Sequence, residues 1–363
     1  MTRVAAIDCG TNSVRLLVAD VPAAGAGLVD VVRTMQIVRL GRGVDRTGRL
    51  DPEAIERVRV VLADYARQIA ELGAEKVRLV ATSATRDASN ASDFRDMVLA
   101  TLGVAPEVIS GDEEARLSFL GATRGLPAVA QPPYLVVDIG GGSTEFVLGG
   151  PAPSGGSATV DRAGTVDGAG GGDTTTVDEA GGTVDIPAPA DGPADVNEPV
   201  AANGAVAVTH AVSVDIGCVR MTERHLPDDP PTPEQVAAAE ADIAAVVDQA
   251  LAVVPGQQAR TLIGLAGSVT TVAALALNLP AYDPARIHHS RIPYADVAAV
   301  THRVLSLTQA ERLALPPMHP GRADVIGAGA LILRVVMEKV GADAVVVSEH
   351  DILDGIAYSL CAA

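Results

Sequence analysis

Tryptophan is absent from this sequence, and only three phenylalanines and five tyrosines occur, so its cores must be built from alanine, valine, leucine and isoleucine. Lys76 and Lys339 are the only lysines among 27 basic residues, a bias that we attribute to GC-rich coding. Cys9, Cys218 and Cys361 are odd in number and far apart, which excludes a disulfide framework or a zinc-binding spacing. No apolar run approaches the ~18 residues that span a bilayer, and the chain begins without a leader pattern. We therefore expect a cytoplasmic protein with no membrane partner.

Acidic residues outnumber basic ones, 45 to 27, so the net charge of the 363 residues is −18. This balance argues against nucleic acid as a partner, since binding to a phosphate backbone depends on a basic surface. The length suffices for two domains, each with its own core. Residues 151–207 are rich in glycine, alanine, proline, threonine and aspartate, and contain no leucine and no aromatic residue. Because such a stretch buries too little apolar surface to offset chain entropy, we expect a disordered acidic insertion there.

The most informative stretch is Tyr134–Leu148, which has the pattern strand, tight turn, strand. Asp138 ends the first apolar run, and Glu145 follows the turn. The turn itself consists of Gly140, Gly141, Gly142, Ser143 and Thr144. A turn without Cβ atoms presents adjacent backbone N–H groups to an anion such as phosphate, and the two carboxylates beside it suit a divalent cation. This combination predicts a site for phosphoryl transfer.

The same pattern occurs near the start of the chain, in residues 4–20. An apolar run ends at Asp8, and a second one follows the turn. The residues of this turn are Gly10, Thr11, Asn12 and Ser13. A single hairpin of this kind is weak evidence for a site. Two in one chain, each with its own aspartate, predict two turns that face one phosphate from opposite sides.

Several other segments allow both a structural and a functional interpretation. The loop 39–49 contains four arginines and is either a solvated loop or a positive wall for an extended anion. The strand 76–81 leads into Thr82–Arg86, which is either a capping turn or an anion site. The strand from Leu262 leads into a helix whose first residues include Gly267, Ser268 and Thr270, where free N–H groups suit an anion.

Three consecutive acidic residues, Asp112, Glu113 and Glu114, follow Ser110 at the start of a predicted helix. The helix dipole favours carboxylates there by a few tenths to ~1 kcal/mol. Because three acids exceed what capping requires, we also consider a catalytic carboxylate. The remaining pattern, with helices after Asp51 and Thr232 that open on a cap and a proline, indicates core elements without chemistry.

Taken in order, these motifs resemble the exopolyphosphatase/guanosine pentaphosphate phosphohydrolase (Ppx/GppA) family of the actin-like ATPase superfamily. The segments that carry the resemblance are AAIDCGTNSVRLLVAD, ATSATRDASN, ISGDEEARLSFLG, VDIGGGSTEFVLG, SVDIGCVRMTERHL and GLAGSVTTVAAL. The resemblance implies an α/β fold with two ribonuclease-H-like domains around a central cleft. We place the domains at 1–125 and 126–363, with the second interrupted by the insertion at about 151–207.

The resemblance also implies an activity and its cofactor. Members of this family remove the terminal phosphate of inorganic polyphosphate, or the γ-phosphate of pppGpp, with Mg²⁺ or Mn²⁺. Polyphosphate is therefore the expected partner, pppGpp is the alternative, and a homodimer is compatible with the family. The chain stops near residue 360 without the helical C-terminal domains of longer members, which favours shorter polyphosphates.

Carried over by position, the family pattern gives roles to individual residues. Glu114 resembles the general base, Glu145 the second acid at the water or metal, and Asp138 and Asp8 carboxylates on the metal side. Arg86 is expected to hold the substrate chain. The residues expected to line the phosphates are Gly10, Thr11, Asn12, Ser13, Gly140, Gly141, Gly142, Ser143, Thr144, Gly267, Ser268 and Thr270.

Other functions stay open from the sequence. A kinase is less favoured, because Glu114 occupies the place of a water-activating base. A module of the same fold that senses phosphate or nucleotides without turnover is a further alternative. The insertion follows the second phosphate hairpin, so its effect on access to the cleft is open. Cys9 lies in the first hairpin, where we expect packing rather than redox chemistry.

Overall fold

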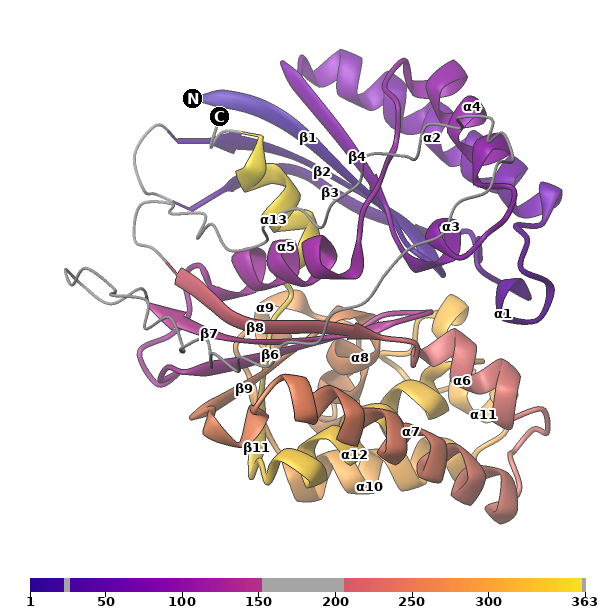
Figure 1. Cartoon of the computed structure of the whole chain (residues 1–363), viewed down its shortest axis with the longest axis vertical. Helices are drawn as coiled ribbons and strands as arrows, with labels where there is room; N and C mark the ends of the chain where they lie inside the picture. Colours follow the sequence, from indigo (N-terminus) through magenta and orange to yellow (C-terminus); the bar gives the residue numbers. More distant parts are fainter. Residues whose placement is uncertain (23–26, 152–205, 361–363) are drawn as a thin grey trace, which may run out of the picture.

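The computed structural model describes residues 1–22, 27–151 and 206–360. These residues form two α/β domains that lie one above the other, each built on a mixed sheet (Figure 1). The insertion predicted at 151–207 lies outside the described residues except at its two ends. None of the described helices is long and apolar enough to cross a membrane.

The first domain contains a five-stranded sheet with the order β3-β2-β1-β4-β5. The first three strands are antiparallel, and β4 and β5 run parallel to β1. This order and these directions are those of the ribonuclease-H-like fold. The predictions of a hairpin in residues 4–20 and of a strand at 76–81 are confirmed. The strands are β1 (Thr2–Cys9), β2 (Ser13–Val21), β3 (Val29–Ile37), β4 (Lys76–Ala81) and β5 (Glu107–Val108).

Helices cover both faces of this sheet. The longest begins as predicted, because the Asp51 side chain caps it by accepting a hydrogen bond from the backbone N–H of Glu53 at 2.8 Å. Its apolar stripe, which includes Leu62 and Tyr65, is buried in the core between this helix and the sheet. The helices of this part of the chain are α1 (Val44–Thr47), α2 (Pro52–Leu72), α3 (Ser83–Arg86), α4 (Ala91–Leu102) and α5 (Gly111–Thr123).

The second domain contains a six-stranded sheet with the order β10-β11-β9-β6-β7-β8. The predicted hairpin of residues 134–148 is confirmed as β6 and β7, and β8 extends it as a third antiparallel strand. Pro151 at the end of β7 pairs with Val206 at the start of β8, so the chain leaves and re-enters the sheet at one point. The strands are β6 (Tyr134–Ile139), β7 (Thr144–Pro151), β8 (Val206–Val214), β9 (Thr261–Leu265), β10 (Arg291–Pro293) and β11 (Ala344–Val347).

A layer of helices packs against the lower face of this sheet and encloses the largest core cluster (Figure 1). The cap predicted at Thr232 is present at the start of α7, where it forms a capping box with Gln235. The helices are α6 (Cys218–His225), α7 (Pro233–Val253), α8 (Ala266–Ala276), α9 (Pro284–Ile287), α10 (Tyr294–Ser306), α11 (Gln309–Leu313) and α12 (Ile326–Val340).

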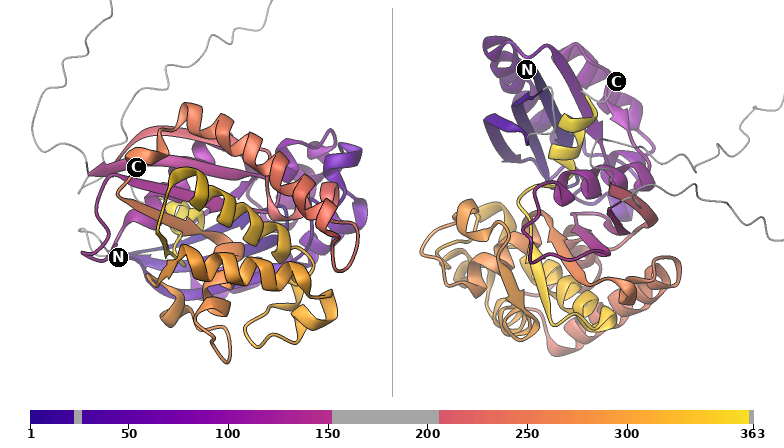
Figure 2. Two further views of the ribbon diagram at one scale, coloured as in Figure 1. Left: turned by 90° about the horizontal axis from the view of Figure 1, so that it is seen from below. Right: turned by 90° about the vertical axis from the view of Figure 1, so that its left-hand side faces the viewer.

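The last helix, α13 (Ile352–Ser359), returns to the first domain, although the sequence analysis grouped residues 126–363 together. It packs against β1, β2 and α5, and Figure 2 shows the yellow C-terminal segment passing from one domain to the other. The face of the first sheet opposite α2 needs an apolar cover, and Leu353 and Ile356 bury Val4 and Leu17 there. Together α5 and α13 fill the space between the two sheets.

Two glycines allow α5 and α13 to cross closely. A Cβ at Gly121 would lie 1.8 Å from the backbone oxygen of Asp351, and one at Gly355 would lie 2.0 Å from the backbone oxygen of Leu117. Gly121→Ala should therefore push the two helices apart and lower the free energy of unfolding by about 3 kcal/mol. Gly27→Ala is the control, because nothing lies within 4 Å of its Cβ position. Chemical denaturation of both variants measures the difference, and equal stabilities would contradict this account of the crossing.

Candidate active site

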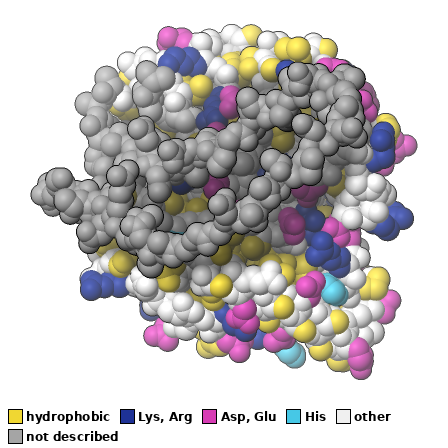
Figure 3. Space-filling view, in the orientation of Figure 1, with side chains coloured by type: hydrophobic (Ala, Val, Ile, Leu, Met, Phe, Trp, Pro, Cys, Tyr) yellow, Lys and Arg dark blue, Asp and Glu magenta, His cyan; other side chains and the backbone are white. Residues whose placement is uncertain are grey.

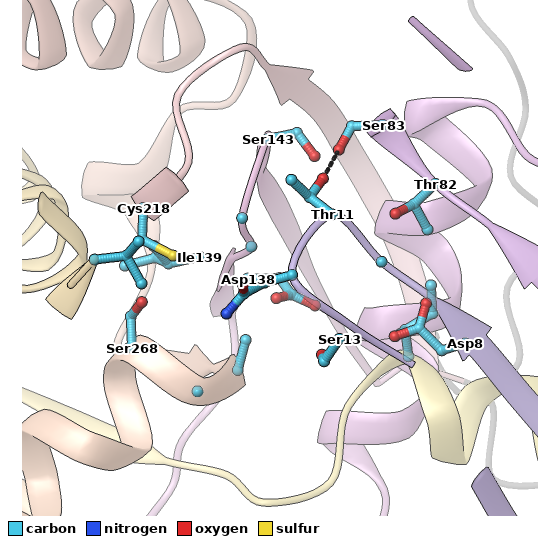
Figure 4. Close-up of a pocket in the computed structure, with 18 of the residues that line it drawn as sticks. Asp8, Thr11, Ser13, Thr82, Ser83, Asp138, Ile139, Ser143, Cys218 and Ser268 are labelled. Atoms are coloured by element: carbon cyan, nitrogen blue, oxygen red, sulfur yellow. Dashed lines mark hydrogen bonds between the residues drawn. The ribbon is translucent and has the colours of Figure 1, made fainter. Parts of the chain in front are cut away.

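A cavity of about 110 Å³ lies between the two domains. Its walls come from the β1–β2 turn, the β6–β7 turn, the start of α5 and the start of α8 (Figure 4). Most of the residues that the sequence analysis selected line it. These are Asp8, Gly10, Thr11, Asn12, Ser13, Glu114, Asp138, Gly140, Gly141, Ser143, Glu145, Gly267 and Ser268.

The two Gly-containing turns contact each other, and both line this cavity. A Cβ at Gly141 would lie 2.9 Å from the Cβ of Thr11, and one at Gly142 would lie 2.8 Å from the Oγ1 of Thr11. Thr11 also shares a hydrogen bond of 2.9 Å with Ser83, drawn as the dashed line in Figure 4. The contact therefore requires glycine in the second turn, and it holds residues 130 positions apart in sequence against each other.

Both turns are closed by the same backbone hydrogen bond. Gly10 N–H donates to Ser13 O, and Gly140 N–H donates to Ser143 O, each at 3.0 Å. Among the hydrogen bonds of the described residues, none uses the N–H of the residues at the tips of these turns. These are Thr11 and Asn12 in the first turn and Gly141, Gly142 and Ser143 in the second. Consecutive unpaired N–H groups of this kind bind phosphate oxygens.

The carboxylate of Glu114 is buried on the wall of the cavity and accepts a hydrogen bond from Arg86 Nη1 at 3.1 Å. Burial raises the pKa of Glu114 to about 8, against the opposing effect of the Arg86 charge, and the nearby carboxylates of Asp138 and Asp8 raise it further. A carboxylate with such a pKa can accept a proton near neutral pH.

Asp138 and Glu145 lie on neighbouring strands in direct register. Burial, with the charge of Asp351, raises the pKa of Asp138 to about 7, although Ser118 Oγ donates a hydrogen bond to it at 2.7 Å. Burial also raises the pKa of Glu145 well above its ordinary value, and Glu114 and Asp138 add to the effect. Ser213 Oγ donates to Glu145 at 2.8 Å. These acids thus form a buried group that repels further negative charge until a cation enters.

Asp8 is paired with an arginine of its own hairpin. Arg15, its partner across the β1–β2 pair, donates from Nε and Nη2 to Asp8 Oδ2 at 2.9 and 2.7 Å. Nη1 of Arg15 donates to Asp351, the N-cap residue of α13. Burial still raises the pKa of Asp8 despite Arg15, and Asp8 Oδ1 is buried without a hydrogen-bond partner. Such an orphaned oxygen is available to a cation.

The donor set fits a hard divalent cation such as Mg²⁺. Carboxylate oxygens are its preferred protein ligands, and it usually takes only one or two of them, with the other positions held by water and phosphate. Within the described residues, no group of three or more His, Cys, Asp or Glu side chains is placed to hold a metal. The arrangement therefore suits a metal that is bound jointly with phosphate.

A second cavity, of about 180 Å³, adjoins the first and is also lined by arginines. Arg322 lines both cavities and donates from Nη1 to Gly267 O at 3.2 Å and to Thr271 Oγ1 at 3.1 Å. No ion pair of the described residues includes Arg322. Arg15 and Arg33 line the second cavity as well. The cleft therefore continues from the carboxylates into a region that can hold further negative charge.

Four residues predicted to contact substrate do not line the first cavity. Arg86 lies behind Glu114 and also donates to Ile109 O, so it acts on the carboxylate rather than on the cavity. Thr144 is fully buried and donates to Ile216 O, because strand side chains alternate and Glu145 takes the face towards the cavity. Gly142 packs against Thr11 and Ser83, and Thr270 lines the second cavity.

Sequence reasoning did not select Arg15, Arg322, Ser118 or Ser213 for the site. A signal for Arg15 was present, because a four-residue turn places it directly opposite Asp8 in the predicted hairpin. Thr82 and Ser83 belong to the segment interpreted as a capping turn or an anion site, and both line the cavity. The contact of Arg322 with Gly267 joins residues 55 positions apart and has no local signal.

The comparison with known families agrees with this geometry. The profile of the Ppx/GppA phosphatase family matches residues 17–157 and 198–362. The chain belongs to the Ppx/GppA phosphatase family. The resemblance drawn from the sequence motifs is thereby confirmed. Because the family is one of phosphatases, this Ppx/GppA phosphatase is an enzyme and not a sensing module.

Its relatives extend over the whole chain. Exopolyphosphatase 2 of Mycobacterium tuberculosis is 46% identical over 374 residues, which cover 99% of each chain. The crystal structure of an exopolyphosphatase-like protein is 40% identical, with a TM-score of 0.81 over 99% of this phosphatase and 98% of that chain. The Aquifex aeolicus member of the Ppx/GppA family is 28% identical, with a TM-score of 0.71 over 99% and 97% of the two chains. The predicted two-domain α/β fold is confirmed by these structures.

The raised pKa of Glu114 has a consequence for stability that needs no substrate. The unfolded chain releases this proton near pH 4.5, whereas the folded protein keeps it up to about pH 8. The free energy of unfolding should therefore fall as the pH rises through this window. Glu114→Gln removes the ionisation and should stabilise the metal-free protein by a few kcal/mol at pH 9, and by little at pH 5.

Denaturant titrations in EDTA at the two pH values measure this difference. Glu113→Gln is the control, because this neighbour in the same helical turn has a half-exposed side chain outside the cavity. If Glu114→Gln raised the free energy of unfolding equally at both pH values, the result would contradict the burial of an ionisable Glu114.

Proposed function

We propose that this phosphatase is an exopolyphosphatase that releases the terminal orthophosphate of inorganic polyphosphate, with Glu114 as the general base. The observation that carries the proposal is the contact of the two turns beside the carboxylate of Glu114, in one cavity. The identity of 46% with an exopolyphosphatase over the full length supports the substrate class.

The geometry suits an end of a phosphate chain rather than its middle. The unpaired N–H groups of both turns can bind the oxygens of one phosphoryl group, and the adjoining cavity with Arg15, Arg33 and Arg322 takes the rest of the polyanion. Arg15 and Arg33 are in ion pairs with aspartates, whereas Arg322 has none among the described residues and can neutralise charge that the −18 protein as a whole would repel. A terminal phosphate held in this way is fixed on one side and open to water on the side of Glu114.

The reaction is a displacement at phosphorus. A water oxygen attacks the terminal phosphorus atom, the bond to the bridging oxygen breaks, and the shortened polyphosphate leaves with the electron pair of that bond. The proton of the water moves to a carboxylate oxygen of Glu114, which Arg86 orients through its hydrogen bond. Glu145, on β7, lines the same cavity and helps to place the water.

One or two of the carboxylates of Asp8, Asp138 and Glu145 would hold Mg²⁺ or Mn²⁺, with phosphate oxygens and water in the other positions. The ion supplies neutralisation of the charge on the transferring and leaving oxygens. Asp8 contributes its unpartnered Oδ1, and Arg15 keeps its other oxygen in place.

Glu114→Gln tests the role of the base directly. The variant should lose at least 10³-fold in kcat for phosphate release from polyphosphate, because its amide accepts no proton. It should bind polyphosphate as tightly as wild type or tighter, because one negative charge is removed from the cavity. A malachite-green assay with Mg²⁺ and titration calorimetry measure the two quantities. Equal losses of binding and turnover would assign Glu114 to ligand or metal binding instead.

The substrate is tested in the same assay with polyphosphates of defined length and with pppGpp. A higher kcat/KM for pppGpp would make this protein a guanosine pentaphosphate phosphohydrolase with the same site. Wild-type protein that binds polyphosphate and releases no phosphate from either compound would overturn the proposed function.

The rate should depend on pH through Glu114. Because the pKa of this carboxyl in the free protein is raised to about 8, kcat/KM for polyphosphate should fall as the pH drops below that value. Arg86 opposes the rise, so Arg86→Gln should move the midpoint of this acidic limb to higher pH. Profiles of kcat/KM between pH 6 and 10 measure both midpoints. An unchanged midpoint in Arg86→Gln would show that another group controls the limb.

A further inference from the structure

The back of the second phosphate turn is held by the start of α6. Cys218 N–H donates to Gly140 O at 2.9 Å, and Val219 N–H donates to Gly141 O at 2.9 Å. Gly217 packs so closely that a Cβ would lie 2.4 Å from the carbonyl carbon of Gly141. The carbonyl groups of Gly140 and Gly141 are therefore bound by the first residues of α6. The N–H groups of Gly141, Gly142 and Ser143 keep no protein partner among the described residues and are left for a ligand.

Arg220 completes this support and extends it to the other domain. Its Nε donates to Gly142 O at 2.7 Å, the third consecutive carbonyl of the turn. Its Nη1 and Nη2 donate to Asp45 Oδ1 at 2.7 Å and to Asp87 Oδ2 at 2.5 Å, both in the first domain. Only 11% of the Arg220 side chain is exposed. One planar guanidinium thus joins a phosphate-binding turn of one domain to two carboxylates of the other.

The surroundings of Arg220 form an interdomain cluster of charges. Arg224, one turn later on α6, donates to both oxygens of Asp45 at 2.7 and 2.8 Å. Between them, Glu223 accepts a hydrogen bond from the backbone N–H of Gly43 at 3.1 Å. Figure 3 shows arginine and acidic side chains gathered where α6 meets the first domain. Arg224 has no hydrogen bond to the turn and none to Asp87, and 35% of its side chain is exposed.

We propose that Arg220 is a positioning residue of the active site, which sets the orientation of the second turn and its distance from the first. The inference rests on the proposed function, because the turn is taken to bind the terminal phosphate. Arg220 does not line the cavity and touches no reacting atom. It acts through Gly142, whose neighbours Gly141 and Ser143 do line it.

The size of the expected effect follows from geometry. The N–H groups of the turn stabilise a transferring phosphoryl group only if they point at its oxygens, and a misplacement of about 1 Å costs roughly 10²-fold in rate. Arg220→Ala frees the Gly142 carbonyl and loosens the contact between the turns. It should therefore lower kcat for polyphosphate 10- to 100-fold, with a smaller change in KM.

Arg224→Ala is the matched control, because it removes an ion pair with Asp45 from the same helix without touching the turn. It should lower kcat less than threefold, and it should lower Tm by less than Arg220→Ala does, because Arg224 is more exposed and bonds to Asp45 alone. Arg220→Lys retains the charge but cannot donate to three acceptors in one plane, so it should recover kcat in part. Equal kcat values for Arg220→Ala and Arg224→Ala would overturn the inference.

Hydrogen exchange supplies a readout that does not depend on turnover. Peptides that contain residues 139–146 should exchange faster in Arg220→Ala than in wild type, and at the wild-type rate in Arg224→Ala. Unchanged exchange in Arg220→Ala would overturn the inference even if its kcat falls. A wild-type protein without phosphate release would instead overturn the proposed function, and exchange would still decide whether Arg220 holds the turn.

Discussion

The contact between Thr11 and the glycines of the second turn is the constraint on which the site depends. Gly141 and Gly142 approach Thr11 more closely than any residue with a Cβ allows, so two turns from different domains form one wall of N–H groups. The domains are fixed around this contact from two sides. The α5–α13 crossing closes one side, and the α6 cluster around Asp45 closes the other. The space left between them is the cavity that holds the carboxylates.

Electrostatics explains why this cavity suits a phosphate with a cation and not a phosphate alone. Glu114, Asp138 and Glu145 are buried together, and burial with mutual repulsion raises the pKa of each of them. Arg15 forms ion pairs with Asp8 and Asp351, and it thereby ties the start of α13 to the first hairpin. Because α13 is the last element of the chain, the site is complete only when the first and last segments have come together.

Local features of this fold follow from the sequence, whereas its distant contacts do not. Both hairpins and the helices capped by Asp51 and Thr232 depend on residues within a few positions of each other, and all of them are present. The return of α13 to the first sheet could not be predicted, because its apolar face fits either domain. Arg86 was expected at the substrate, yet its partner is Glu114, 28 positions away, and no local pattern specifies such a pairing.

The join between β7 and β8 gives this fold an unusual freedom. Residues 151 and 206 are partners in the sheet, and the phosphate turn lies at the opposite end of β7. A segment of any length between these two residues leaves and re-enters the domain at one point of the sheet. The entropic cost of closing such a loop grows only with the logarithm of its length. The length of this segment can therefore differ without altering the register of β7 and β8. The position between residues 151 and 206 is therefore suited to the insertion of a reporter or affinity domain.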